Sequence, residues 1–83
     1  MATILYFGSL PDIIRKTREN IILAGSINNV GDLLAHIRKR GDKWQEVMDL
    51  KYVQVTVNRQ FANEGTAVSN DDEIAIISIG LLK

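Results

Sequence analysis

Two short stretches of the chain are apolar at almost every position. Residues 3–7 read Thr-Ile-Leu-Tyr-Phe and are followed by Gly8-Ser9, and residues 73–79 read Glu-Ile-Ala-Ile-Ile-Ser-Ile. Because successive side chains of a β-strand point to opposite faces of a sheet, both stretches predict strands that are apolar on both faces. Such strands are typical of the centre of a sheet. We therefore expect these two strands to lie side by side at the centre of one sheet.

Residues 52–57 alternate between apolar and polar positions, and their three valines share one face. This alternation predicts a strand with one face turned toward the core. Asn58-Arg59 predicts a tight turn, because asparagine tolerates unusual backbone angles. Residues 60–62 then return as a short strand. Gly65 and the polar residues 69–72 predict loops before the final strand.

The clearest helix signal spans residues 30–37. Its apolar residues recur at positions i, i+3, i+4 and i+7, and they are Val30, Leu33, Leu34 and Ile37. Asn28 or Asn29 can cap this helix; with Asn29 as the cap, Asp32 occupies the third helical position. Residues 38–40 are basic and favour the last turn, and Gly41 is expected to end the helix. The single apolar stripe predicts a helix that covers one face of the sheet.

Three other segments carry weaker signals. Pro11-Asp12 predicts a helical stretch of about two turns through Arg18, and we expect its basic residues to face solvent, with an acidic partner surface as the alternative. Residues 20–24 predict a short strand. Residues 42–50 predict a connection with a helical turn. Within it, Trp44 is interpreted as a plug over the edge of the core, and partner contact is the alternative.

Composition and charge exclude several functions. The chain has 83 residues, which support one domain spanning residues 1–83, and it has no cysteine. Ten basic and ten acidic residues cancel, so non-specific nucleic-acid binding has no electrostatic driving force. No stretch has the length of a membrane span or the layout of a signal peptide, so a cytoplasmic protein is expected. His36, the only histidine, is expected to face solvent; we predict no catalytic residue, no metal site and no cofactor.

The predicted elements follow the order strand, helical turn, strand, helix, strand, short strand, strand. One main helix packed across one face of a mixed sheet is an α+β arrangement in two layers. We expect four to five strands in this sheet.

Taken together and in order, five segments resemble the ubiquitin-like β-grasp sulfur carriers, most closely the small subunit of molybdopterin synthase. These segments are Ile4-Leu5-Tyr6-Phe7-Gly8, the helix from Val30 to Ile37, Asp42-Lys43-Trp44, Val55-Thr56-Val57-Asn58, and Asp72-Glu73-Ile74-Ala75. Thiamine-pathway carriers of the same fold are usually shorter and lack a counterpart to residues 42–50, so we rank that branch lower.

The resemblance implies a function in molybdenum cofactor biosynthesis. Members of the family carry sulfur as a thiocarboxylate on a C-terminal glycine, after an adenylating enzyme has activated that carboxylate with ATP. The charged tail then enters the active site of a large catalytic subunit, which holds the catalytic side chains. By this resemblance the protein is a non-catalytic carrier subunit with two partners, the adenylating enzyme and the large subunit.

The apolar second face of the two central strands is the expected docking surface for such a partner. It comprises Phe7, Ile77 and Ile79, together with Leu5. For Phe7, ordinary core packing remains an equal interpretation.

The C-terminal tail, residues 79–83, departs from the family pattern. The family ends in Gly-Gly, whereas this chain ends Gly80, Leu81, Leu82, Lys83, so that Leu82 and Lys83 occupy the glycine positions. A serine and an isoleucine also stand where many relatives have prolines. Gly80 would serve as the modified residue only after removal of the last three residues, which shortens the reach of the tail by roughly 10 Å.

Three explanations are open for this tail. The chain is a small-subunit homologue that has lost the carrier chemistry or uses Leu-Lys in a matched partner channel. Alternatively, it is a β-grasp interaction module that docks on a partner without carrying sulfur. In the third explanation, the end of the chain has been altered from its natural form. We take the sulfur-carrier function as the main prediction and the interaction module as the alternative.

Overall fold

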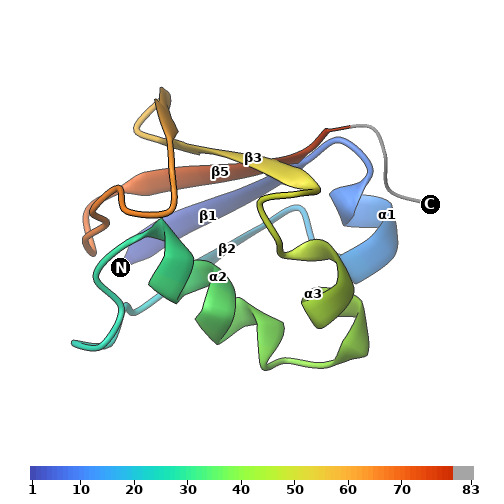
Figure 1. Cartoon of the computed structure of the whole chain (residues 1–83), viewed down its shortest axis with the longest axis horizontal. Helices are drawn as coiled ribbons and strands as arrows, with labels where there is room; N and C mark the ends of the chain where they lie inside the picture. The colour runs from blue at the N-terminus through green and yellow to red at the C-terminus, as the bar shows by residue number, and fades with distance from the viewer. Residues whose placement is uncertain (80–83) are drawn as a thin grey trace.

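The computed structural model describes residues 1–79, which form a five-stranded sheet with helices packed against one of its faces (Figure 1). In chain order the elements are β1 (Ala2–Phe7), α1 (Leu10–Ile14), β2 (Arg18–Ile21), α2 (Val30–Arg38), α3 (Asp42–Val47), β3 (Val53–Val57), β4 (Gln60–Ala62) and β5 (Glu73–Ser78). The α+β fold class predicted from the sequence is confirmed.

The two strands predicted to be central lie side by side. The strand order is β2-β1-β5-β3-β4, and β1 and β5 are the parallel pair in an otherwise antiparallel sheet. The turn between β3 and β4 consists of Asn58 and Arg59, whose φ angles are 52° and 70°. Positive φ at both central residues is the geometry of a type I′ hairpin turn, which suits the twist of the strands it joins.

The core lies between the sheet and α2. Side chains of β1, β5 and β3 alternate across the sheet, so one set faces the helix, and its buried members are Ala2, Ile4, Tyr6, Val53, Val55, Ile74 and Ile76. The predicted stripe of α2 meets this face, and all four of its apolar residues are buried. Asn29 caps the helix, since its side-chain oxygen accepts a hydrogen bond of 2.8 Å from the backbone N–H of Asp32.

The first helix is shorter than the two turns predicted from Pro11 to Arg18. It ends at Ile14, because Arg15 adopts a left-handed backbone with φ of 60° and donates its N–H to the carbonyl of Pro11. A residue in this conformation terminates a helix by satisfying its last carbonyls. The basic residues beyond it are exposed, as the sequence suggested.

The second strand was predicted too late in the chain. It spans Arg18–Ile21 rather than residues 20–24, because its register is set by pairing with β1, in which Ala2 opposes Ile21 and Leu5 opposes Arg18. Leu23 then leaves the sheet and is buried, and its N–H donates to the side-chain oxygen of Asn70 at 2.8 Å.

The end of α2 also differs from the prediction. The helix ends at Arg38, and Gly41 precedes α3 instead of terminating α2. Gly41 has a positive φ of 150°. Arg40 therefore does not lie in the last turn of α2. Its side chain crosses to β2, as described below. In the described part of the chain, no helix has both the length and the apolar character needed to cross a membrane.

Candidate functional site

The face of the sheet opposite the helices carries an apolar surface at the end of the two central strands. We call Leu5, Phe7, Ile77 and Ile79 the outer patch. Phe7 and Ile77 are direct partners across the parallel β1–β5 pair. Phe7 and Ile79 are each 47% exposed, whereas Leu5 and Ile77 are half-buried. The patch is therefore accessible from solvent, and packing against the helices does not account for it.

Phe61 extends this apolar face and was not singled out from the sequence. Thr56 of β3 is paired with both Ala75 of β5 and Phe61 of β4, so the three side chains lie on the same face. Phe61 is 83% exposed. The two-residue turn at Asn58-Arg59 contained the necessary signal, because such a turn fixes the register of the hairpin and places Phe61 opposite a polar, outward residue.

The last described residues of the chain are tied to the body next to the outer patch. Ile79 donates its backbone N–H to the carbonyl of Tyr52 at 3.0 Å, and the backbone N–H of Ser9 donates to Ser78 Oγ at 2.8 Å. The predicted tail residues Gly80, Leu81, Leu82 and Lys83 lie outside the described residues. The last described residue, Ile79, is therefore itself part of the outer patch and is held through its backbone.

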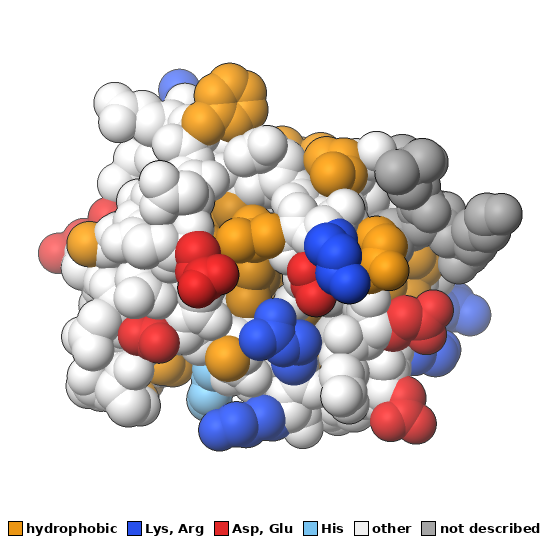
Figure 2. Space-filling view, in the orientation of Figure 1, with side chains coloured by type: hydrophobic (Ala, Val, Ile, Leu, Met, Phe, Trp, Pro, Cys, Tyr) orange, Lys and Arg blue, Asp and Glu red, His pale blue; other side chains and the backbone are white. Residues whose placement is uncertain are grey.

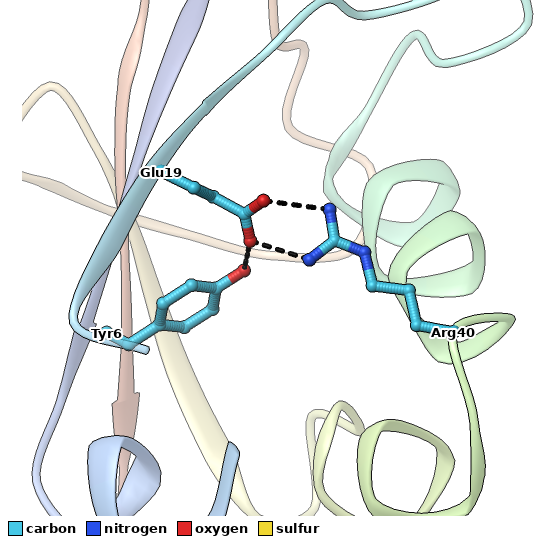
Figure 3. Close-up of polar contacts among 3 residues, drawn as sticks. All are labelled: Tyr6, Glu19 and Arg40. Carbon is cyan, nitrogen blue, oxygen red and sulfur yellow. Dashed lines mark hydrogen bonds and ion pairs between the residues drawn. The ribbon is translucent and has the colours of Figure 1, made fainter. Parts of the chain in front are cut away.

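A polar cluster lies beneath the opposite face, where β1 and β2 meet the connection between α2 and α3. Tyr6 donates its hydroxyl to Glu19 Oε2 at 2.6 Å, and Arg40 donates to both oxygens of the same carboxylate at 2.7 and 2.9 Å (Figure 3). The Arg40 guanidinium also lies 4.8 Å from the centre of the Trp44 ring, which meets the Tyr6 ring edge-on at 5.9 Å. Trp44 is half-buried against the core, as expected for a plug.

The ionisation equilibria of this cluster are coupled. Burial raises the pKa of Tyr6 above its ordinary value, and the neighbouring Glu19 carboxylate raises it further. Burial alone would disfavour the charged Glu19, but hydrogen bonds from Arg40 and Tyr6 outweigh it and lower the pKa of Glu19. Perturbed pKa values often mark active sites. Here every charged group is matched by a partner, so the cluster acts as a tie between strands and helices.

This tie predicts an acid-dependent loss of stability. Because the pKa of Glu19 is lower in the folded state, its contribution is complete above the ordinary glutamate pKa of about 4.3 and is lost as the pH falls through the folded-state value. Urea unfolding between about pH 7 and pH 3 is expected to show a steeper decline for the wild type than for Glu19→Gln. Both proteins share all other carboxylates, so parallel pH profiles would contradict the assignment.

The described residues do not assemble a recognisable catalytic or metal site. His36 is exposed on α2, and no group of three or more His, Cys, Asp or Glu side chains within residues 1–79 is arranged to hold a metal ion. A hollow of about 410 Å³ lies between the start of α2, the α3–β3 connection and the β4–β5 loop. Its Asp32 and Asp49 carboxylates accept hydrogen bonds from the backbone N–H groups of Asn28 and Lys51, so both fix local backbone.

The lining of this hollow includes no hydroxyl, thiol or imidazole group among the residues that the structure describes. A nucleophile–base pair is therefore missing from it. On the face shown in Figure 2, Lys and Arg side chains lie among Asp and Glu side chains. This face therefore does not present the single-sign charge that nucleic-acid binding requires.

A scan against protein families matches residues 4–80 to the model described as the ThiS family. This match covers β5, α2, all of the outer patch and β1 from its third residue, Ile4, onward. It therefore includes every residue of the docking surface that was predicted from the apolar second face of the sheet.

Solved structures from Pyrococcus furiosus and Haloferax volcanii share the fold of this chain. A protein from Pyrococcus furiosus, described as a molybdopterin converting factor subunit 1, superimposes on this chain with a TM-score of 0.76. The two sequences are 22% identical over 93% of this chain and 94% of that one. SAMP1 from Haloferax volcanii gives 0.76 at 18% identity over 99% and 98% of the two chains. A second structure of that small archaeal modifier protein 1 gives 0.65 at 21% identity, over 93% and 94%. These likenesses establish the shared fold.

Proposed function

The chain belongs to the ThiS family, and we propose that it is a sulfur carrier that docks through its outer patch and presents its C-terminal segment to the active sites of larger partner proteins. The observation that carries this proposal is the position of the patch. Ile77 and Ile79 flank Ser78, the last residue of β5, and Phe7 is the register partner of Ile77. A partner that binds the patch therefore holds the segment that follows Ile79 close to its own surface.

The proposed carrier role divides the labour between this chain and its partners. A carrier needs a carboxylate at the end of a thin segment, a surface for docking and a rigid body that connects the two. Adenylation with ATP and the later sulfur transfer then use the side chains of the partners. We propose an adenylating enzyme and a large synthase-like subunit as these partners, and molybdenum cofactor biosynthesis as the pathway, by analogy with the sequence resemblance and with the structural neighbour from Pyrococcus furiosus.

A protein-interaction module without sulfur chemistry is the second candidate. Leu82 and Lys83 favour it, because they occupy the positions of the two glycines that close the family pattern. Glycines lack side chains and adopt most backbone conformations, so they pass through a narrow channel more easily than leucine and lysine do. Both candidates use the same outer patch, and they differ only in the chemistry of the terminal carboxylate.

Intact mass spectrometry distinguishes the two candidates. The full chain is incubated with the adenylating enzyme of its source organism, ATP and a sulfide donor. A carrier is expected to gain the mass difference between one sulfur and one oxygen atom, and omission of ATP is expected to abolish this gain. No gain by the wild type, together with a gain by the Leu82→Gly/Lys83→Gly double variant, would assign the protein to the interaction-module class.

A further inference from the structure

A pair of serine residues joins the two segments that carry the outer patch. Ser78 Oγ accepts two hydrogen bonds from Ser9, one from its backbone N–H at 2.8 Å and one from its Oγ hydroxyl at 3.0 Å. The two residues are separated by 69 positions in the sequence. We call Gly8, Ser9 and Ser78 the clasp. It closes the loop between β1 and α1 onto the last residue of β5.

Gly8 makes this contact possible in two ways. Its φ of 73° belongs to the left-handed region, which glycine adopts without strain. A Cβ atom at this position would lie 2.2 Å from Ser78 Oγ, so any other residue would push the hydroxyl out of place. The backbone at Gly8 therefore approaches the side chain of Ser78 more closely than a residue with a Cβ atom would allow.

The end of β5 is also held from its other side. Ser78 is the register partner of Val53 in the β3–β5 pair, and the next residue, Ile79, donates its N–H to the carbonyl of Tyr52 at 3.0 Å. The chain is thus fixed by the β1–α1 loop on one side and by Tyr52 on the other. These contacts continue to the last residue that the structure describes.

The clasp lies between the residues of the outer patch without belonging to it. Phe7 directly precedes Gly8, and Ile77 and Ile79 flank Ser78. Because side chains alternate along a strand, Ile77 and Ile79 face outward while Ser78 faces the opposite side and bonds to Ser9. A partner bound to the patch therefore contacts the two segments that the clasp joins, and leaves the serine pair free to act within the carrier.

We propose that Ser78 is a positioning residue, which through Ser9 fixes the end of β5 relative to the outer patch. This inference rests on the proposed carrier function. Docking affinity comes from the patch, whereas the placement of the terminal carboxylate against ATP depends on how firmly the end of β5 is fixed. Reactions that need a precise approach lose rate when a positioning contact is loosened.

The test compares Ser78→Ala, Ser9→Ala and Ser78→Thr with the wild type. Ser78→Ala removes the acceptor of both hydrogen bonds, Ser9→Ala removes only the side-chain bond, and Ser78→Thr keeps a hydroxyl. NMR hydrogen exchange of the Ser9 amide reports the clasp itself, independently of any sulfur chemistry. ATP-dependent pyrophosphate release by the adenylating enzyme of the source organism, measured at a series of carrier concentrations, separates kcat from KM.

We expect Ser78→Ala to accelerate exchange of the Ser9 amide and to lower kcat by about threefold to tenfold. This loss corresponds to one ordinary hydrogen bond although two are removed, because both are exposed and water partly replaces them. KM should stay within about twofold of the wild type, since the patch is intact. Ser9→Ala should give a smaller loss, and Ser78→Thr should restore both exchange and kcat.

Unchanged Ser9 exchange in Ser78→Ala would overturn the clasp. A rise in KM comparable to that of a patch variant would also overturn the inference, because Ser78 would then belong to the docking surface. If the wild type itself is not adenylated, the carrier function fails and the positioning role fails with it. Adenylation of the wild type together with equal kcat for Ser78→Ala is a distinct result, which overturns the positioning role alone.

Discussion

Leu33→Ala is expected to lower the free energy of unfolding by about 2–5 kcal/mol, and Leu34→Ala by a similar amount. Leu33 is 0% exposed and Leu34 is 2% exposed, and both lie in the stripe with which α2 covers the sheet. Truncation removes buried methyl groups and leaves a cavity that neighbouring side chains fill only in part. For a domain of this size, such a loss is a large share of the total stability.

Urea unfolding followed by circular dichroism measures this effect, and the midpoint should fall while the slope stays unchanged. His36→Ala is the matched control, because His36 lies on the same helix and is exposed. Surface substitutions of this kind change stability by no more than about 0.5 kcal/mol. A loss for His36→Ala as large as that for Leu33→Ala would contradict the role of core packing, because removal of an exposed side chain leaves no buried cavity.

Phe7→Asp and Ile77→Asp are expected to weaken binding to the large subunit or to the adenylating enzyme by about 30-fold or more. This corresponds to the loss of at least 2 kcal/mol that is typical for a central residue of an interface. Phe7 is 47% exposed, so a charge at this position remains hydrated in the free protein but would be buried without a partner in the complex. Isothermal titration calorimetry measures the affinity, and thermal unfolding of each free variant reports the fold.

Ile22→Asp serves as the control for these patch variants. Ile22 is 73% exposed and follows the end of β2, whose neighbouring Ile21 pairs with Ala2 at the opposite end of β1 from Phe7. Its substitution should leave partner affinity unchanged. If Phe7→Asp unfolds the domain, the side chain belongs to the core, and the outer patch is not a docking surface.

The sequence predicted the elements whose signal lies within a few consecutive residues. The stripe of α2, its cap at Asn28 or Asn29 and the two-residue turn at Asn58-Arg59 are local patterns. The structure confirms the stripe and the turn, and it selects Asn29 as the cap. The same holds for the two central strands, because a strand that is apolar on both faces has few other places in a small sheet. The outer patch was predicted by the same alternation, and its docking role remains a prediction.

Elements without such a local pattern were predicted at the wrong residues. β2 has the sequence Arg-Glu-Asn-Ile, which does not alternate between apolar and polar residues. The strand was therefore predicted at residues 20–24, which are more apolar. Pairing with β1 decides where this strand lies, and a single-sequence pattern does not contain that information. Phe61 was partly predictable. The turn before it fixes the register of β4, but the residue type alone does not show which face of the sheet the side chain occupies.

By itself the amino-acid sequence determined the secondary structure with strong periodicity, the two-layer fold and the apolar character of the second sheet face. These features follow from the alternation of side chains along strands and helices, which is a property of neighbouring residues. The tertiary structure alone decided which distant polar groups meet. Glu19 accepts a hydrogen bond from Arg40, which is 21 positions away in the sequence, and Ser78 accepts one from Ser9, which is 69 positions away. Such pairs depend on how the completed sheet and helices are packed, because hydrogen bonds require donor and acceptor within about 3 Å and no local pattern encodes that distance.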